Sequence, residues 1–417
     1  MQLHFKAISE PGKPGVKWQR LFNIHWPAYR KWLISEKRSE TPTLEASKEA
    51  LKKYMPEMIP TYNRLCKLIK ADPEAAQFLT GFQPPSYLNG CAQVVLKGKE
   101  PRLIRNYDYH PALTEGTQLL SCWNGKQVIA TSDCLIGVLD GINEDGLAVS
   151  LSFGGRPEVG IGFGIPFILR YILEFCSTHE EAVAALCRIP THMAYNVTVV
   201  DKSGGHKTVR LAPGRKPEVT EDNYVTNHQG TVNWPENAAF NQTVERSASL
   251  EQTLLLSKMD AELVLNAFLA PPLYNIRYAE GFGTLYTAEY LPKKGKVNIY
   301  WPGEKLSQSF KNFTETYKRI DFDKIVSDLR IHSENVLDQD AETSDPTSTG
   351  WQETVTESIV NAMANKNPTA SRQQLEKLRQ EIRKRGVISW KAVMNYWNKL
   401  GKSTSEIKYI NRQSIKK

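Results

Sequence analysis

The chain has 417 residues, of which 41% are hydrophobic and 24% are charged, and its formal net charge is +8. This composition is typical of a folded protein and excludes extensive disorder, while the length predicts one large domain with appendages. Much of the basic excess lies in the last third of the chain, so the charge alone does not indicate a nucleic-acid-binding protein.

The first residues and the apolar runs of the chain bear on its expected location. Residues 1–6 lack the apolar core of a secretory signal, and no apolar run reaches the roughly 20 residues that a membrane helix needs. We therefore expect a cytoplasmic protein that does not enter a membrane. In that compartment the six cysteines are expected to be reduced, and none forms a C-x-x-C pair that would indicate zinc binding or redox exchange.

The first part of the chain is predicted to end in an exposed loop. Residues 1–24 predict two short strands around a Pro/Gly turn, and a helical stretch follows over about 44–71, interrupted at Pro56 and Pro60. Residues 83–90 are rich in Pro, Ser, Asn and Gly, which is typical of a loop that can be cut.

Two hairpins follow this loop, and further strands and helices alternate in blocks. The runs 91–96 and 103–107 form the first hairpin, and 118–122 and 127–130 form the second around Asn124-Gly125. The other predicted strands are 134–139, 147–153, 195–201, 206–211, 223–226, 284–290 and 297–301, and the predicted helices are 167–176, 180–187, 246–257 and 261–268. This order predicts an α+β domain in which two packed antiparallel sheets are covered by helices.

The carboxy-terminal part has a different composition. Residues 331–350 are rich in Ser, Thr, Asp and Glu and predict a linker, and residues 351–417 carry basic helical patterns. We expect this appendage to be a solvated helical element or a docking site for a protein partner, in preference to a nucleic-acid surface.

The stretch around Cys91 is the candidate reaction centre. The first hairpin brings Cys91 beside Arg105 and Asp108, so that a guanidinium can contact the sulfur and a carboxylate can accept a hydrogen bond from an amine. A thiol with a pKa of about 8.5 is mostly protonated at neutral pH and needs a base. The α-amine of Cys91, with a pKa of about 7.7–8.0, becomes that base once the thiol has attacked the Gly90 carbonyl and the Gly90–Cys91 bond has been cleaved. Gly90 is expected to help because glycine tolerates a strained backbone.

These residues carry a family resemblance. Cys91 followed by Arg105-Asn106-Tyr107-Asp108 resembles the signature of the cysteine N-terminal nucleophile hydrolases, the group of the choloylglycine hydrolases and penicillin acyltransferases. Residues 140–150, with Asn143-Glu144-Asp145-Gly146-Leu147, are similar to the Asn-Glu-x-Gly-Leu segment of that group. The long segment before Gly90 resembles the acyl-CoA:6-aminopenicillanic acid acyltransferase branch more than the bile-salt branch. The resemblance implies a four-layer αββα sandwich.

The resemblance also implies roles for the site residues. Arg105 would assist the nucleophile, Asp108 would hold the α-amine, and Asn227 would donate to the developing oxyanion. Arg246 is the candidate for a second arginine, on its order and spacing. Ser152 stands where bile-salt hydrolases have Asn, which argues against a bile-salt substrate. Neither a metal nor an organic cofactor is implied.

Together these observations predict a pro-segment over 1–90 that resembles an α-subunit, a catalytic domain over 91–330, the linker and the appendage. The leading hypothesis is an autoprocessed cysteine amidohydrolase or acyltransferase that takes a small-molecule acyl amide or acyl-CoA through a thioester on Cys91. The alternative is a non-enzymatic relative of the same fold that serves as a binding module.

Less specific interpretations remain open for single residues. One such interpretation is that Arg105 and Asp108 form only a surface ion pair. Asn143 and Gly146 are expected to be turn residues. Most other cysteines are expected to be small buried hydrophobic residues, namely Cys66, Cys134, Cys176 and Cys187.

Overall fold

The structure is a computed structural model that describes residues 1–35, 42–87, 90–257, 260–280 and 282–329. All described residues belong to one compact unit, which spans residues 1–331. The predicted linker at 331–350 and the predicted appendage at 351–417 lie outside the described residues. Within the described part, no helix is both long enough and apolar enough to cross a membrane.

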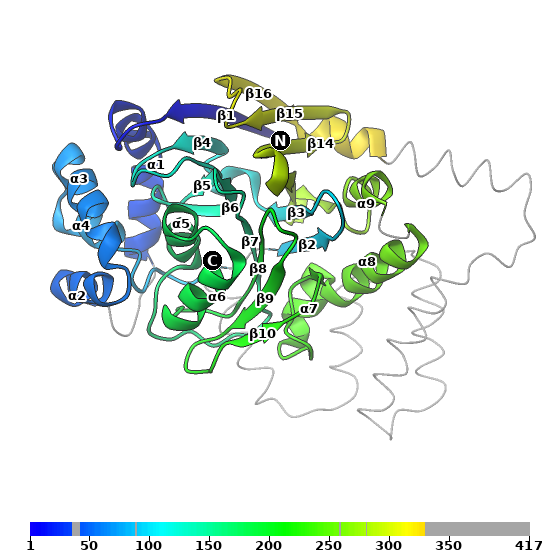
Figure 1. Cartoon of the computed structure of the whole chain (residues 1–417), viewed down its shortest axis with the longest axis horizontal. Helices are drawn as coiled ribbons and strands as arrows, with labels where there is room; N and C mark the ends of the chain where they lie inside the picture. Colours follow the sequence, from blue (N-terminus) through cyan, green and yellow to red (C-terminus); the bar gives the residue numbers. More distant parts are fainter. Residues whose placement is uncertain (36–41, 88–89, 258–259, 281, 330–417) are drawn as a thin grey trace, which may run out of the picture. The chain divides into compact units, whose positions relative to one another are not determined.

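Two β-sheets form the centre of the first unit (Figure 1). The nine-stranded sheet has the order β10 (Glu218–Thr220), β9 (His206–Leu211), β8 (Tyr195–Val200), β7 (Ala148–Phe153), β6 (Gly137–Asn143), β5 (Val128–Asp133), β4 (Thr117–Ser121), β1 (Gln2–Glu10) and β16 (Thr316–Asp321). The seven-stranded sheet has the order β11 (Tyr224–Val225), β2 (Gly90–Leu96), β3 (Arg102–Tyr109), β13 (Phe282–Leu291), β14 (Lys296–Trp301) and β15 (Glu304–Ser309), and β12 (Ile276–Arg277) pairs with β13. Neighbouring strands are antiparallel except β1 and β4, which are parallel.

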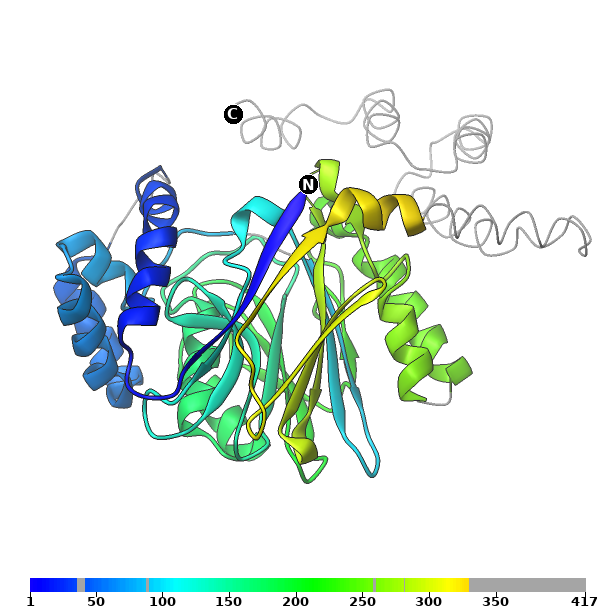
Figure 2. The same cartoon turned by 90° about the horizontal axis from the view of Figure 1, so that it is seen from above.

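Helices cover both outer faces of the two sheets. They are α1 (Val16–Ser35), α2 (Leu44–Tyr54), α3 (Ile59–Ile69), α4 (Pro73–Phe78), α5 (Ile165–Phe175), α6 (His179–Arg188), α7 (Pro235–Asn241), α8 (Thr243–Ser257) and α9 (Ala261–Phe268), with short 3-10 helices η1 (Pro56–Met58), η2 (Pro111–Leu113), η3 (Tyr278–Glu280) and η4 (Pro292–Lys294). Figure 2 shows α1–α4 on one side of the sheets and α8 and α9 on the other. Helices α5 and α6 pack on the nine-stranded sheet, and α8 and α9 pack on the seven-stranded sheet. The predicted αββα sandwich is therefore confirmed, with β1–β4 as a parallel exception to its antiparallel sheets.

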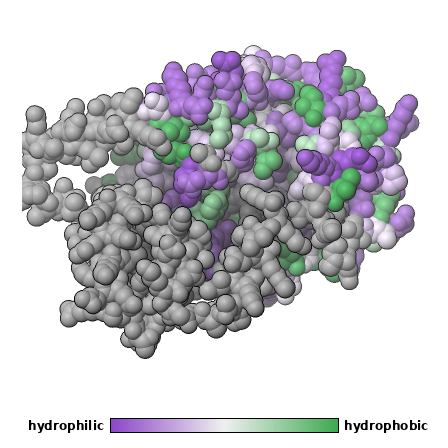
Figure 3. Space-filling model, turned by 180° about the vertical axis from the view of Figure 1, so that it is seen from behind, coloured by the Kyte–Doolittle hydropathy of each residue, from purple (hydrophilic) through white to green (hydrophobic). Residues whose placement is uncertain are grey.

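The central strands are buried over their whole length because each lies between a helical layer and the other sheet. All residues of β5, β6, β7 and β8 are buried. Helix α5 is buried on nearly every side, and Pro166 lies in its first turn, where proline is favoured. By contrast, Figure 3 shows hydrophilic and apolar side chains interspersed on the surface of the described residues seen from behind.

The amino-terminal segment differs from its prediction. Residues 16–24 begin helix α1, whereas a second strand was expected there. The helix is favoured because Trp18 and Phe22 lie one turn apart and are both buried in the core. The carboxylate of Glu10 accepts hydrogen bonds from the backbone N–H groups of Gly15, Lys17 and Trp18, and so satisfies the start of α1.

The other differences also have local causes. The predicted helix 44–71 is interrupted at Pro56 as expected, where η1 separates α2 from α3, but Pro60 does not interrupt it, since Pro60 lies in the first turn of α3. Residues 134–136 form a turn, since Cys134 and Leu135 have φ angles of 53° and 67°, and β6 starts only at Gly137. Strands β15 and β16 were not predicted because they lie at sheet edges and contain mostly polar residues.

Candidate active site

The predicted hairpin around Cys91 is confirmed by the pairing of β2 with β3. In this antiparallel register Gly90 lies opposite Asp108, Cys91 opposite Tyr107 and Gln93 opposite Arg105. The hairpin therefore brings the start of β2 against the Arg105–Asp108 stretch, as the sequence predicts.

Cys91 lies in a closed, charged environment. Its side chain has no exposed surface, and Nη2 of Arg105 donates a hydrogen bond to its Sγ at 3.1 Å. Burial raises the pKa of the Cys91 thiol to about 11, although the positive charge of Arg105 acts in the opposite direction. In the continuous chain the thiol is therefore protonated at neutral pH, and attack by its sulfur requires a proton acceptor.

Arg246 connects the other candidate residues. This buried arginine of α8 donates to the Cys91 carbonyl oxygen at 2.9 Å, to Oδ2 of Asp108 at 3.1 Å and to Oδ1 of Asn227 at 2.5 Å. Its Nε donates to the Asn241 carbonyl oxygen at 2.9 Å, which fixes the guanidinium from the helix side. Arg246, which was proposed only from its order and spacing, thus contacts three other predicted site residues.

Asp108 is a buried carboxylate between two donors. Besides Arg246, it accepts a hydrogen bond from Oγ1 of Thr284 at 2.7 Å. Burial raises the pKa of Asp108, and the positive charge of Arg246 counteracts that rise. Because Arg105 and Asp108 are both fully buried and pair with different partners, the interpretation as a surface ion pair is wrong.

Asn227 also reaches Cys91, but through its amide oxygen. Its Oδ1 accepts the backbone N–H of Cys91 at 3.0 Å, and its Nδ2 donates to the Phe153 carbonyl oxygen at 3.2 Å. The amide N–H that the resemblance assigns to an oxyanion is thus bonded to the backbone in the continuous chain. The side chain instead holds the nitrogen that would become the α-amine.

A supporting residue was missed in the sequence. Oγ1 of Thr243, the first residue of α8, accepts the backbone N–H of Asn227 at 2.7 Å, and its carbonyl oxygen accepts from Oγ1 of Thr226 at 3.0 Å. Thr243 thereby joins the Thr226-Asn227 pair to the helix that carries Arg246. The only signal in the sequence is its place three residues before Arg246.

Gly90 is needed for space rather than for unusual backbone angles. It lies in strand β2 and its φ is outside the left-handed region, so the expected strain is not what selects glycine here. A Cβ at Gly90 would lie 2.1 Å from Cζ of Phe282 and 3.1 Å from Cβ of Asp108. Glycine therefore lets the bond before Cys91 approach both neighbouring side chains.

Ser152, which differs from the bile-salt pattern, contacts the loop that carries Asn227. Its Oγ donates to the Thr226 carbonyl oxygen at 2.8 Å. Asn196, directly opposite on β8, donates from Nδ2 to the carbonyl oxygens of Thr226 and His228. The buried amide of Asn196 thus supports the same loop, a role that the sequence did not indicate.

The less specific interpretations have mixed outcomes. Asn143 is a structural turn residue, since its Oδ1 accepts the Leu147 N–H at 3.0 Å, and Gly146 has a φ of 83°. Cys134 and Cys176 are buried as expected. Cys66 is only half-buried and Cys187 is exposed, so the prediction of burial is wrong for Cys187, which lies in the outward-facing last turn of α6.

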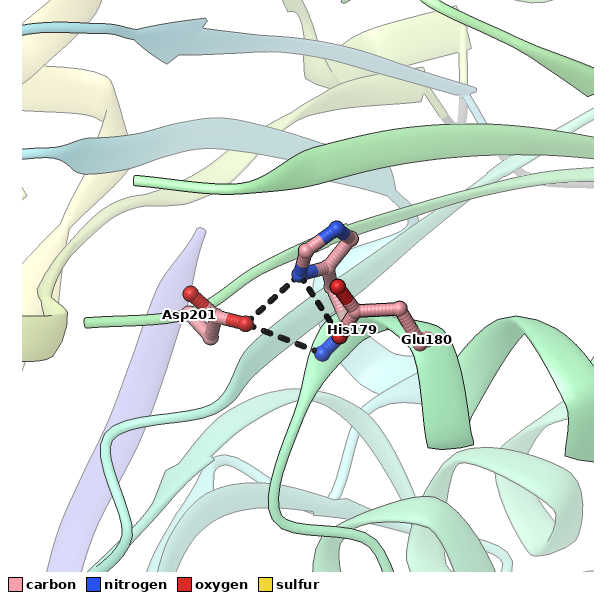
Figure 4. Close-up of side chains that lie close together, drawn as sticks. All are labelled: His179, Glu180 and Asp201. Atoms are coloured by element: carbon pink, nitrogen blue, oxygen red, sulfur yellow. Dashed lines mark hydrogen bonds and ion pairs between the residues drawn. The ribbon is translucent and has the colours of Figure 1, made fainter. Parts of the chain in front are cut away.

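A second cluster of titratable groups lies at the start of α6 (Figure 4). Within the described part of the chain, His179, Glu180 and Asp201 are the one group of three His, Cys, Asp or Glu residues whose possible metal-ligand atoms all lie within 4.8 Å of one another. Nδ1 of His179 and its backbone N–H both contact Oδ2 of Asp201, at 2.6 and 3.1 Å, while Oδ1 of Asp201 accepts the N–H of Ser203. These bonds attach the first turn of α6 to the β8–β9 turn, and we assign the cluster to the fold.

Comparison with known proteins gives one match in sequence. The profile of the family described as acyl-coenzyme A:6-aminopenicillanic acid acyl-transferase matches residues 95–306, about half of the chain. The match begins just after Cys91 and includes Arg105, Asp108, Asn227 and Arg246. No curated protein matched the sequence.

Several solved structures resemble the chain at low similarity. A mutant of conjugated bile acid hydrolase from Clostridium perfringens has a TM-score of 0.38 and 14% identity, covering 55% of this chain and 96% of that one. Penicillin V acylase from Agrobacterium tumefaciens has a TM-score of 0.38 and 16% identity, covering 55% and 91%. The Caenorhabditis elegans ortholog of N-acylethanolamine-hydrolyzing acid amidase has a TM-score of 0.35 and 15% identity, covering 55% and 100%.

The family assignment rests on the sequence match, which includes four of the five predicted catalytic residues. It confirms the resemblance to the penicillin acyltransferase group of the N-terminal nucleophile hydrolases. The chain therefore belongs to the acyl-coenzyme A:6-aminopenicillanic acid acyl-transferase family, and it is an enzyme that acts on amide bonds.

Proposed function

We propose that this enzyme is an autoprocessed cysteine amidohydrolase or acyltransferase that carries the acyl group of a small-molecule amide or thioester on Cys91. The observation that supports this most directly is the 3.1 Å contact between Nη2 of Arg105 and the buried sulfur of Cys91. A fixed guanidinium favours a thiolate over a thiol at that position, which is the state that attacks a carbonyl carbon.

The first reaction would be cleavage of the chain itself. The Cys91 sulfur forms a bond to the Gly90 carbonyl carbon and its proton passes to the Cys91 nitrogen, while the bond between that carbon and nitrogen breaks. The product is a thioester between Gly90 and the Cys91 side chain, with a free α-amine on Cys91. Water then hydrolyses the thioester, which releases the Gly90 carboxylate and restores the thiol.

The contacts of the Cys91 backbone suit this step. Arg246 donates to the Cys91 carbonyl oxygen, and Asn227 accepts the N–H that becomes part of the amine. Both contacts hold the backbone of the nucleophile still while the bond in front of it is exchanged. They also leave a lone pair on the new amine available, because Asn227 presents an acceptor to it.

The freed amine would then serve the turnover of external substrates. With a pKa of about 7.7–8.0 it accepts the thiol proton near neutral pH, whereas the amide nitrogen of the continuous chain does not. The resulting thiolate attacks the acyl donor, and the amine returns its proton to the leaving amine or thiol. Water or an amine then takes the acyl group from Cys91.

Two expectations about the rest of the molecule stay predictions. They are the cytoplasmic location, and the docking of a protein partner by residues 351–417. The alternative of a non-enzymatic binding module is disfavoured by the family match, and the experiments below separate it from the enzyme.

The mass spectrum of the purified protein tests the proposed cleavage. We expect two polypeptides, one ending at Gly90 and one beginning with Cys91, because the thiol, the glycine and the supporting arginine already lie together. An intact chain after prolonged incubation would contradict the autoprocessing step. Sequencing the new amino terminus distinguishes cleavage at Gly90–Cys91 from proteolysis within the predicted loop 83–90.

Two probes separate the possible external reactions. We expect release of the chromophore from a chromogenic acyl amide if water accepts the acyl group, and release of CoA from an acyl-CoA that depends on an added amine if the enzyme is a transferase. Failure of both probes, in a protein whose cleavage has been verified, would contradict the proposed substrate class and leave the cleavage chemistry intact.

A further inference from the structure

Asp140 of β6 is a buried carboxylate whose two oxygens are both fully engaged. Its Oδ2 accepts from Nη1 of Arg105 and from the hydroxyl of Tyr286, the latter at 2.7 Å. Its Oδ1 accepts from Oγ1 of Thr131 at 3.0 Å and from the hydroxyl of Tyr290. Four donors from three other strands therefore hold this one side chain in place.

The Arg105–Asp140 pair connects the two sheets. Arg105 belongs to β3 in the seven-stranded sheet, and Asp140 belongs to β6 in the nine-stranded sheet. Both side chains have no exposed surface, so the pair lies in the interior where charge interactions are strong. Asp140 is part of the 140–150 segment that carries the family resemblance, yet neither the resemblance nor the mechanism above gives it a role.

The other hydrogen bonds of Arg105 fix the orientation of its guanidinium group. Its Nε donates to the Leu151 carbonyl oxygen at 3.0 Å, and its Nη1 donates to Asp140 and to the Tyr286 hydroxyl at 3.3 Å. Two sides of the planar guanidinium are thus occupied, and the third side, Nη2, faces the sulfur of Cys91.

We propose that Asp140, supported by Tyr290, is the positioning residue that aims Arg105 at the sulfur of Cys91. This inference rests on the proposed function of Cys91 as the nucleophile. Asp140 itself does not contact the sulfur. Its effect on the reaction passes through the orientation of the guanidinium, in the way that outer residues orient the direct ligands of a reactive centre.

Asp140 could act through its own negative charge or through the orientation of Arg105, and the two roles predict opposite changes in the pKa of the Cys91 thiol when Asp140 is replaced. The charged groups that act on the thiol are Arg105, Asp108 and Arg246. If Asp140 acted only through its negative charge, Asp140→Asn would strengthen the effect of Arg105 and lower the pKa of the Cys91 thiol. If it positions Arg105, the same change releases the guanidinium from the sulfur and raises that pKa.

Tyr290→Phe isolates the geometry without changing any charge. It removes one hydroxyl that contacts Asp140, and leaves the Arg105–Asp140 pair and the contact of Tyr286 in place. Tyr300→Phe is the matched control. The Tyr300 hydroxyl donates to Glu289 of β13 at 2.8 Å, and Glu289 pairs with Arg102 of β3. Tyr290 and Arg105 belong to these same two strands. The control therefore removes a tyrosine–carboxylate–arginine contact that does not face Cys91.

The experiment measures the thiol directly and then the reaction. The ultraviolet absorbance of the thiolate is titrated in each full-length protein as the difference from its Cys91→Ser counterpart. The rate of Gly90–Cys91 cleavage is followed by mass spectrometry. We expect Tyr290→Phe to raise the pKa of the Cys91 thiol and slow cleavage about fivefold, and Asp140→Asn to raise it further and slow cleavage about 10- to 100-fold. Tyr300→Phe is expected to change neither quantity.

An unchanged or lowered thiol pKa in Tyr290→Phe and Asp140→Asn would overturn the inference. If Asp140→Asn does not fold, the result for Tyr290→Phe decides on its own. The titration needs neither cleavage nor turnover, so a failure of the proposed function can be told apart from a failure of this inference. In that case the wild-type protein stays uncut and inactive, while Tyr290→Phe still has a higher thiol pKa than the wild type.

Discussion

Replacing Cys91 by alanine is expected to leave the chain uncut after Gly90 and to reduce turnover of a chromogenic acyl amide by at least about 10⁴-fold. The sulfur forms the bond to the acyl group, and its attack on the Gly90 carbonyl also frees the α-amine that serves as base. One substitution therefore removes the nucleophile and prevents the release of its base. Intact mass and initial rates of chromophore release measure the two effects in the same preparation.

The matched control is Cys176→Ala. Cys176 is also buried, and burial raises the pKa of its thiol to about 11 as it does for Cys91, but Cys176 lies at the end of α5, outside the candidate site. Cleavage and turnover at wild-type rates are expected in this variant. Cleavage in the Cys91→Ala variant would show that another group or an outside protease cuts the chain.

Replacing Arg246 by methionine is expected to lower the free energy of unfolding by about 3–5 kcal/mol, because it leaves the carboxylate of Asp108 buried without its cation. The carbonyl oxygen of Cys91 and Oδ1 of Asn227 lose a donor in the same change. Urea unfolding at equal protein concentration measures the loss, and turnover is expected to fall with it.

The pH dependence of that loss identifies its cause. Burial already raises the pKa of Asp108, and removing Arg246 raises it further above the ordinary value of about 3.9. The folded state then binds this proton more tightly than the unfolded state, so the free energy of unfolding falls as the pH rises above that value. The deficit of Arg246→Met is therefore expected to be larger at about pH 8 than at about pH 5.

The double variant Arg246→Met with Asp108→Asn provides the control. Because it removes the stranded charge, it is expected to recover part of the lost stability and to lose the pH dependence, while turnover stays low. A double variant that is as unstable as the sum of both single variants would show that the two side chains do not stabilise each other.

The sequence was informative where chemistry depends on local spacing. The hairpin register follows from a turn-prone segment between two apolar runs, so the proximity of Cys91 and Arg105 could be derived from the chain alone. The role of Arg246 could be proposed only from its order and spacing in the chain. Arg246 lies on a helix more than a hundred residues after Cys91, and only the fold brings it to the Cys91 carbonyl oxygen.

Other features depend on contacts that no local pattern encodes. Asp140 is one acidic residue among 45 Asp and Glu residues, and only the packing of two sheets brings it to Arg105. Gly90 was correctly singled out, but the reason lies in the ring of Phe282, which is nearly two hundred residues away. Helix α1 was not predicted because it has no capping residue directly before it. The free backbone N–H groups at its start are instead bonded by the carboxylate of Glu10, which lies on the other side of a loop.

The position of β1 has a consequence for any chain that is cut after Gly90. This strand lies between β4 and β16, so the smaller fragment contributes an inner strand to a sheet whose other members all belong to the larger fragment. The two fragments would stay together as one particle without a covalent link. Denaturation would release them as separate molecules, and recovery would then become a second-order process that slows on dilution, unlike the recovery of the uncut chain.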